Sequence, residues 1–280
     1  MSRTCLITGA GGALGAALAQ AFAAEGYGLI LCGRSLDKLK AASENLRGQA
    51  RLEYAVCDLA APESIEIIGA AADSLGGADI IINNAAVQGP IGPFAENDFC
   101  EWEKALTIDF IRPAALIQRL LPLMMKKGWG RIINIAGGGA SQVRPFFSAY
   151  ASAKTALVRF SETLAAELKP FGITVNSVSP GAMRSAMTEE INARADKAGP
   201  GEALAAQKLL ADGGRPPENA AALCLFLCRP QADGISGKMI SAVWDDYGNW
   251  PEHLPELDEG GLYTLRRLTA RDKGYTWGDK

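Results

Sequence analysis

Short apolar runs rich in Ile, Leu and Val alternate with longer stretches of helical spacing along most of this chain. Examples of the runs are "TCLITG", "YGLILCGR", "ADIIINNAA" and "GRIINIA". Strands that read as near-continuous apolar runs belong to sheets that helices cover on both faces. Alternating strands and helices imply parallel pairing with right-handed crossovers. The pattern therefore predicts an α/β fold, a doubly wound parallel sheet in three α/β/α layers, as a single domain.

The expected elements follow from hydrophobic spacing and from turn and cap residues. Strands are predicted at 4–9, 27–34, 51–59, 78–86, 130–136, 172–181 and 237–243. Helices are predicted at 13–26, 35–48, 62–77, 98–126, 149–168 and 217–228. Residues 186–215, rich in Ala, Gly and charge, are expected to form an irregular, mobile flap. Residues 1–245 would form the domain, and 246–280 a C-terminal extension packed on it or at a subunit interface.

Composition excludes several classes of function. The chain has 280 residues and a net charge of −3, without a basic patch, so a nucleic-acid partner is not expected. It has no apolar run near the roughly 18 residues that would span a bilayer, and no signal sequence, which favours a cytoplasmic location. The six cysteines are scattered and the only histidine is His253, so no metal site is predicted.

The stretch "TCLITGAGGALGAALA" places glycines between the first strand and the first helix. Bare backbone at such a turn lets a pyrophosphate approach, and the helix N-terminus offers free N–H groups and a positive dipole end. Gly9 and Gly15 are the expected backbone contacts, and Gly11 and Gly12 would supply flexibility. The alternative is a tight connection without a ligand.

The end of the second strand bears on which dinucleotide is bound. An NAD site usually has an acidic residue here, whereas this chain has Gly33 followed by Arg34. A guanidinium suits the 2′-phosphate of NADP, so NADP(H) is predicted over NAD(H), with a solvated surface arginine as the alternative. Asp58 in "VCDL" is predicted to lie near the adenine, or else to cap a helix.

In order and spacing, the motifs "TGAGGALG", "CDL", "NNAA", "YASAK", "SPGAMRS" and "ISG" resemble those of the classical short-chain dehydrogenase/reductase family, from residue 3 to about 243. The resemblance implies a Rossmann-like subunit that binds NAD(P) and moves a hydride to or from a carbinol or carbonyl carbon. It also implies a nicotinamide site. The predicted cofactor contacts are Gly9, Gly11, Gly12, Leu14, Gly15, Arg34, Asp58, Leu59, Asn84, Ala85, Tyr150, Lys154, Pro180, Gly181 and Ser185.

Tyr150 and Lys154 carry the expected proton chemistry. An ammonium near a phenol favours the phenolate and lowers its pKa from about 10, and the i, i+4 spacing puts both on one helix face. Following "NIAGGG" in this motif order, the pair predicts an acid/base tyrosine. In the family the lysine also holds the nicotinamide ribose.

Three positions depart from the family pattern. Ala13 stands where the middle glycine of the loop is usual, and Asp109 stands where an asparagine is usual. Gly137 replaces the customary serine that donates to the substrate oxygen, and removal of such a donor can cost on the order of 10²–10³ in turnover. The candidate replacements are Ser141, which is slightly favoured, Ser148, and the backbone amides of Gly137 and Gly138. The predicted catalytic set is Tyr150, Lys154, Asp109 and Ser141.

The expected activity is NADP(H)-dependent interconversion of a hydroxyl and a carbonyl on a small polar molecule, with a sugar derivative as one candidate. Arg144 in "SQVRPFF" would hold a carboxylate or phosphate, or else be a surface charge. Two alternatives are left open. The chain could be an NAD(P)-using dehydratase or epimerase, or it could be a cofactor-binding regulatory protein with weakened catalysis. The helix at 149–168 corresponds to one that pairs subunits in the family, which predicts a homodimer or homotetramer.

Overall fold

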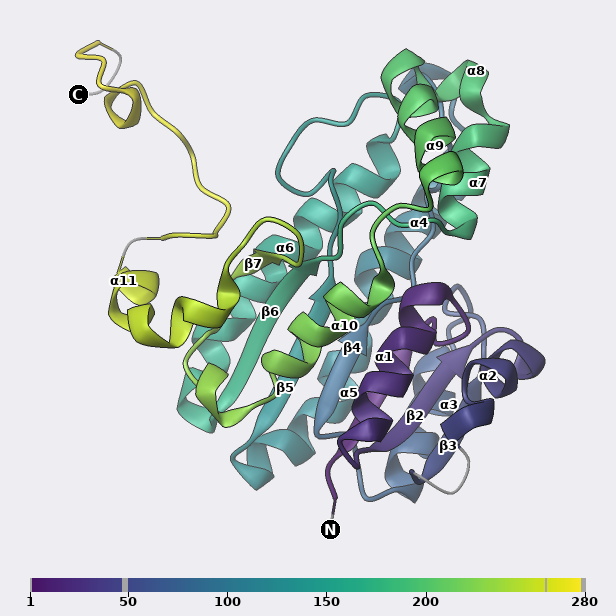
Figure 1. Ribbon diagram of the computed structural model, residues 1–280, viewed down its shortest axis with the longest axis vertical. Coiled ribbons are helices and arrows are strands. Elements are labelled where there is room, and N and C mark those ends of the chain that lie inside the picture. The colour runs from purple at the N-terminus through teal and green to yellow at the C-terminus, as the bar shows by residue number, and fades with distance from the viewer. Residues whose placement is uncertain (1, 47–49, 260, 278–280) are drawn as a thin grey trace.

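The computed structural model describes residues 2–46, 50–259 and 261–277. Its centre is a seven-stranded sheet in the order β3-β2-β1-β4-β5-β6-β7 (Figure 1), and every neighbouring pair is parallel. The strands are β1 (Thr4–Thr8), β2 (Gly28–Gly33), β3 (Leu52–Val56), β4 (Ile80–Asn83), β5 (Gly130–Ile135), β6 (Ile173–Ser179) and β7 (Met239–Ser241). The predicted doubly wound parallel sheet is confirmed.

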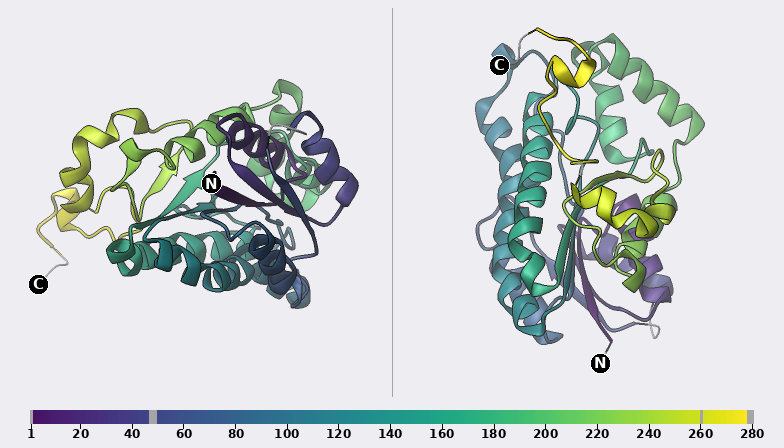
Figure 2. Two further views of the ribbon diagram at one scale, coloured as in Figure 1. Left: turned by 90° about the horizontal axis from the view of Figure 1, so that it is seen from below. Right: turned by 90° about the vertical axis from the view of Figure 1, so that its left-hand side faces the viewer.

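Helices cover both faces of the sheet, as Figure 2 shows edge-on. They are α1 (Ala13–Ala24), α2 (Leu36–Ala42), α3 (Ser64–Ser74), α4 (Phe99–Leu106), α5 (Arg112–Lys127), α6 (Ser148–Leu168), α7 (Ala186–Ala193), α8 (Ala195–Ala198), α9 (Pro200–Asp212), α10 (Pro217–Phe226) and α11 (Leu254–Glu259).

The apolar core divides into two large clusters, one on each face of the sheet. Along β1, Cys5 and Ile7 pack with α1 and α10, while Leu6 packs with α3, α5 and α6. Successive strand side chains point to opposite faces, so one short apolar run contributes to both clusters. This explains why polar residues hardly ever alternate with apolar ones along the strands.

The chain order of the strands reverses between β1 and β4. In doubly wound sheets, ligands bind in the crevice outside the carboxyl ends of the strands at this switch point. The glycine turn after β1, the segment after β4 and the loops after β5 and β6 therefore meet at one edge.

Two helical regions differ from expectation. The flap expected to be irregular over 186–215 is mostly helical: it consists of α7, α8 and α9, beyond the carboxyl ends of the strands (Figure 1). We call this excursion, residues 186–212, the lid. The predicted helix over 98–126 is interrupted by a π-helical segment, Thr107–Ile111, between α4 and α5. Such segments are frequent at functional sites because they shift the helix register locally.

The C-terminal segment begins packed against the domain. Trp250, in the 3₁₀ segment Tyr247–His253, and Leu257 in α11 are both buried in the core on the α1 face. The backbone N–H of Met239 in β7 donates to the Tyr263 carbonyl over 2.8 Å. The Leu265 N–H still donates to Glu162 Oε1 of α6 over 2.6 Å, and beyond it the chain runs away from the body (Figure 1). Among the described residues, no helix has the length and apolar character to cross a membrane.

Candidate active site

Tyr150 and Lys154 lie one turn apart on α6 and are both buried, with 8% and 1% of their surface exposed. Lys154 Nζ donates to the backbone carbonyl of Ile135, at the end of β5, over 2.9 Å. The same nitrogen is 5.7 Å from the centre of the Tyr150 ring. The shared helix face expected from the i, i+4 spacing is present, and it faces the carboxyl edge of the sheet.

Asp109 is fully buried in the π-helical segment beside this pair. Its Oδ1 accepts from the Val87 backbone N–H over 2.9 Å, and its Oδ2 is 3.8 Å from Lys154 Nζ. Within the described residues, Oδ2 has no hydrogen-bond partner. Burial raises the pKa of this carboxyl to about 6, although the Lys154 charge and the Val87 N–H oppose the shift. Asp109 therefore changes its charge close to neutral pH.

The pKa of Tyr150 moves opposite to expectation. Burial raises it to about 12, the Asp109 charge adds to the rise, and the Arg144 charge opposes it. Burial also lowers the pKa of Lys154, although Asp109 acts to raise it. The predicted lowering of the tyrosine pKa is thus wrong for the protein alone, because removal from water and the Asp109 charge together outweigh the lowering by Arg144.

The main chain at Gly137 lies directly against the tyrosine hydroxyl. A Cβ atom on Gly137 would be 2.2 Å from Tyr150 Oη, too close for any side chain without movement. Of the proposed replacements for the missing serine, Ser148 Oγ accepts from Trp102 Nε1 over 3.1 Å. Ser141 is exposed on the loop between β5 and α6, and its assignment stays a prediction.

The glycine turn has the close backbone approach that a pyrophosphate site needs. Gly9 has φ +65°, and a Cβ there would lie 2.9 Å from Ala85 Cα. A Cβ on Gly15 would lie 2.3 Å from the Gly9 carbonyl oxygen. Only glycine at position 15 therefore allows α1 to begin this close to the turn after β1. No side chain caps α1 at Gly12, which leaves N–H groups of its first turn for an anion. Ala13 is exposed in that turn, so its extra methyl group displaces nothing in the core.

Asn84 supports this turn from the neighbouring strand end. Its Nδ2 donates to the carbonyls of Thr8, over 2.9 Å, and Gly9, over 3.2 Å. Thr8 Oγ1 accepts from the backbone N–H groups of Asn84 and Ala85, each over 3.0 Å. Thr8 was missed by sequence reasoning, although a hydroxyl at a strand end just before a glycine turn is a usable signal.

The adenosine end of the expected site opens into a cleft of about 370 Å³. Arg34 and Asp58 line it, together with Gln88 and the lid residues Arg194 and Lys197. Both Arg34 and Asp58 are exposed, and Asp58 Oδ1 also accepts from the Ala60 backbone N–H over 2.9 Å. The Asp58 carboxylate therefore stabilises a local turn, and the residue also lines the cleft.

The same end holds Leu59, which is buried, and its carbonyl accepts from Arg112 Nε over 2.9 Å. This bond ties the segment after β3 to the start of α5.

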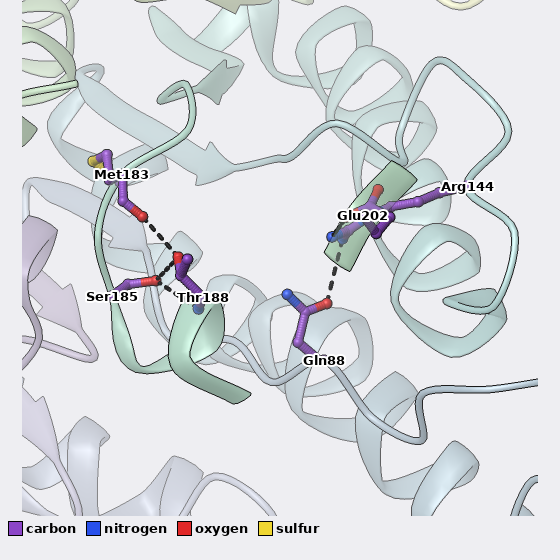
Figure 3. A network of polar contacts seen from close by, with 6 residues as sticks. All are labelled: Gln88, Arg144, Met183, Ser185, Thr188 and Glu202. Carbon is purple, nitrogen blue, oxygen red and sulfur yellow. Dashed lines mark hydrogen bonds and ion pairs between the residues drawn. The ribbon is translucent and has the colours of Figure 1, made fainter. Parts of the chain in front are cut away.

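At the opposite end, the loop after β6 carries Pro180, Gly181 and Ser185. Gly181 has φ +86°, and a Cβ there would be 2.5 Å from a Val243 methyl carbon. Ser185 caps α7: its Oγ accepts from the Thr188 backbone N–H over 3.3 Å (Figure 3). The loop that would face the nicotinamide therefore leads directly into the lid.

Comparison with known proteins shows which family the chain belongs to. The sequence profile of the family described as short chain dehydrogenase matches residues 3–196. The chain belongs to this family. It is 32% identical over 256 residues to a D-beta-hydroxybutyrate dehydrogenase of Rhizobium meliloti (strain 1021), covering 86% of this chain and 97% of that one.

Two solved structures show the same short-chain dehydrogenase fold. L-sorbose reductase from Gluconobacter frateurii, complexed with NADPH and L-sorbose, is 29% identical with a TM-score of 0.75, covering 86% of this chain and 94% of that one. An NAD⁺-bound xylitol dehydrogenase is 25% identical with a TM-score of 0.77, covering 85% and 96%. This short-chain dehydrogenase is accordingly an NAD(P)-dependent oxidoreductase that acts on small molecules.

Arg144 is not the free surface charge left open by the sequence. Its side chain is only 15% exposed, and its Nε and Nη2 donate to the two carboxylate oxygens of Glu202 over 2.8 Å each. Nη1 donates to Gln88 Oε1 over 3.3 Å (Figure 3), and the guanidinium lies 4.0 Å from the Phe147 ring centre. Sequence reasoning missed Gln88 and Glu202. No local signal could pair Arg144 with a residue 58 positions away.

The acidic residues that follow β7 form local hydrogen bonds. Asp245 Oδ2 accepts from the Ser241 backbone N–H over 2.7 Å, and Asp246 accepts from Asn249 Nδ2 over 2.6 Å. The Trp244 side chain is 82% exposed. In the described part of the chain, no three His, Cys, Asp or Glu side chains gather as a metal site would need.

Proposed function

We propose that this short-chain dehydrogenase is an NADP(H)-dependent enzyme that interconverts a hydroxyl and a carbonyl on a small polar substrate, with Tyr150 as acid and base. The observation that supports it most is the buried group of Tyr150, Lys154 and Asp109 beside the glycine turn. Titratable groups whose pKa values are shifted by burial and by a specific charged partner mark candidate functional sites.

The dinucleotide, when bound, would supply or accept the hydride. Its pyrophosphate would rest on Gly9, Gly15 and the first turn of α1. Lys154 uses one N–H on the Ile135 carbonyl and has others for the nicotinamide ribose. The remaining cofactor contacts we propose are Gly11, Gly12, Leu14, Asp58, Leu59, Asn84, Ala85, Pro180, Gly181 and Ser185.

The high pKa of Tyr150 bears on the direction of the reaction. With a pKa of about 12, the side chain is a neutral phenol at pH 7 and can donate its proton to the oxygen of a carbonyl that is being reduced. Oxidation requires the phenolate, which this environment disfavours. We therefore propose that, near neutral pH, the resting enzyme holds Tyr150 in the protonation state that carbonyl reduction uses, whereas the net direction depends on the ratios of cofactor and substrate.

A second donor to the substrate oxygen is proposed from the loop after β5. Because Gly137 has no hydroxyl, we keep Ser141 as the candidate, with the Gly137 and Gly138 backbone N–H groups as the alternative. Ser141→Ala should lower turnover if its hydroxyl serves; unchanged turnover would leave the backbone amides.

NADP(H) preference is proposed from Arg34, which lines the cleft at the adenosine end. Arg34→Asp should weaken NADPH binding much more than NADH binding, because it removes a cation and adds a charge that repels the 2′-phosphate. Titration of both cofactors by fluorescence measures the two affinities. Equal losses would overturn the preference.

The activity itself is tested with purified full-length protein, NADPH or NADP⁺, and a panel containing L-sorbose, xylitol and 3-hydroxybutyrate. Turnover of at least one compound, abolished in Tyr150→Phe with cofactor affinity retained, is the expected result. The alternative supported by Gly137 is a cofactor-binding regulatory protein with decayed catalysis. It predicts tight NADPH binding with no turnover on any carbonyl or alcohol offered. Substrate conversion without net change in the dinucleotide would instead indicate a dehydratase or epimerase.

We also propose, from the family resemblance, that the chain forms a homodimer or homotetramer through α6. Sedimentation over a range of concentrations tests this, and a monomer throughout would contradict it.

A further inference from the structure

We propose that Arg144 selects substrates that carry a carboxylate. Without substrate, the Glu202 carboxylate of the lid accepts hydrogen bonds from the Arg144 guanidinium, and a substrate carboxylate would displace it. This inference rests on the proposed function and specifies the substrate class of the same site. The chemical class it assigns is the short oxo acid or hydroxy acid.

The guanidinium is held in place by the body of the protein, independently of the lid. Gln88, 4% exposed, accepts from Nη1 over 3.3 Å and belongs to the segment that follows β4. The Phe147 ring centre lies 4.0 Å from the guanidinium carbon, and the Tyr150 ring centre lies 5.3 Å from it. Cations are attracted to aromatic faces, so both rings orient the group. Arg144 is thus positioned next to the proposed acid/base residue whichever anion it binds.

The lid contributes only a carboxylate to this arrangement. Glu202 is in the first turn of α9, and its two oxygens accept from Nε and Nη2 in parallel, over 2.8 Å each. Two parallel N–H···O bonds are how arginine recognises a planar carboxylate. A substrate carboxylate would form the same two bonds and would release the glutamate to solvent.

The exchange is feasible because Glu202 is not fully buried. Its side chain is 33% exposed, against 15% for Arg144, so the pair is in contact with water from the lid side. The bidentate geometry makes this pair stronger than most surface ion pairs, so a competing group must replace both hydrogen bonds. Replacing one carboxylate by another conserves the hydrogen bonds of the arginine.

The proton chemistry is linked to the same exchange. The Arg144 charge lowers the pKa of Tyr150, and the Glu202 charge raises it. A bound substrate carboxylate would take over the place of Glu202 without adding an anion to the site, so the tyrosine would keep its proton for donation to the carbonyl.

The test compares 3-oxobutyrate with its methyl ester, which has the same reacting carbonyl but no charge. We would measure kcat and KM with NADPH for the wild type, Arg144→Gln and Glu202→Gln, with Glu189→Gln, an exposed acid of α7, as the matched control. Arg144→Gln should raise KM for the acid by roughly 10–100-fold and change that for the ester little, the range expected for hydrogen bonds to a charged group. Glu202→Gln should lower KM for the acid a few-fold, because a competitor is removed, whereas Glu189→Gln should change neither.

A second variant separates selection of the substrate from latching of the lid. The double exchange of Arg144→Glu with Glu202→Arg keeps the ion pair but moves the cation onto the lid. It should recover the thermal midpoint of the wild type, yet it should not recover the preference for the acid. If it restores that preference, or if every variant affects acid and ester alike, Arg144 only fastens the lid and the proposal is overturned.

A binding measurement distinguishes this failure from failure of the proposed function. Calorimetric titration of NADP⁺-loaded protein with 3-oxobutyrate should show binding that Arg144→Gln abolishes, even if no hydride is transferred. Absence of binding, or equally strong competition by inorganic phosphate, would overturn the assignment to carboxylates.

Discussion

At the residue scale, the hydroxyl of Tyr150 occupies the space that a side chain at position 137 would fill. A Cβ on Gly137 would be 2.2 Å from Tyr150 Oη, whereas a Cβ on Gly138 would meet no atom within 4 Å. Gly137 therefore does more than leave out a serine hydroxyl. It permits the position that the tyrosine adopts here.

We expect Gly137→Ala to lower kcat by about a hundredfold, because displacement of a reacting group by about 1 Å has that effect. Steady-state kinetics on the best substrate of the panel measures it. Gly138→Ala is the matched control and should retain activity within a few-fold, since its methyl group meets open space. Equal behaviour of the two variants would show that the tyrosine hydroxyl works from another position.

Asp109→Asn should shift the pH dependence of the reaction. The anionic carboxylate raises the pKa of Tyr150, so its removal should lower that pKa and move the basic limb of the kcat/KM profile for reduction to lower pH. The asparagine keeps the size of the side chain and can still accept from the Val87 N–H. An unchanged or upward-shifted limb would mean that Asp109 is not charged in the working enzyme.

At the scale of elements, the contact between β1 and α1 depends on one glycine. A Cβ on Gly15 would lie 2.3 Å from the Gly9 carbonyl oxygen and 2.6 Å from Ala10 Cα, and both are backbone atoms that cannot rotate away. Gly12 is different, because its Cβ would meet the Gly9 oxygen at 3.5 Å, an ordinary contact.

Gly15→Ala should therefore destabilise the protein by roughly 1–3 kcal/mol or more, the usual cost of overpacking, and weaken dinucleotide binding. Urea unfolding and cofactor titration measure the two effects. Gly12→Ala should change the free energy of unfolding much less. If both variants unfold at the same urea concentration, the close approach of α1 is not a constraint.

At the scale of the whole molecule, burial of Asp109 makes global stability depend on pH. Its pKa in the folded protein is about 6, above the ordinary value of 3.8 expected in the unfolded chain. The unfolded chain therefore loses this proton first as pH rises. The stability associated with the group is complete below about pH 4 and is lost as pH rises through about 6, by roughly 3 kcal/mol, because each tenfold difference in proton affinity is worth about 1.4 kcal/mol.

Asp109→Asn lacks this titration, so the difference in unfolding free energy between the two proteins should change between pH 4 and pH 7. Urea unfolding at a series of pH values measures it, with the wild type losing stability relative to the variant as pH rises. Parallel curves across this range would contradict the raised pKa of the buried carboxyl.

The sequence predicted the sheet, all seven strands and most helices, because the spacing of apolar residues along each element indicates which of its faces is buried. Ser35 caps α2 as its type and place indicate, and its Oγ accepts from the Lys38 N–H. The lid was expected to be irregular, since its Ala- and Gly-rich composition lacks a clear apolar face. Its helices α7, α8 and α9 pack on one another, and they bury apolar residues against Ile91, Phe147 and Tyr150, which are distant in sequence.

For the candidate site, the sequence by itself determined which residues meet at the carboxyl edge of the sheet, because motif order and strand order place them there. Tyr150, Lys154, Asp109 and the glycine turn all follow from that. Only the tertiary structure decided how they behave. Burial raises the pKa of Tyr150, the tyrosine hydroxyl fills the space at Gly137, and Arg144 pairs with Glu202 of the lid. Desolvation and contacts between distant segments depend on every neighbour in space, and spacing along the chain carries no record of them.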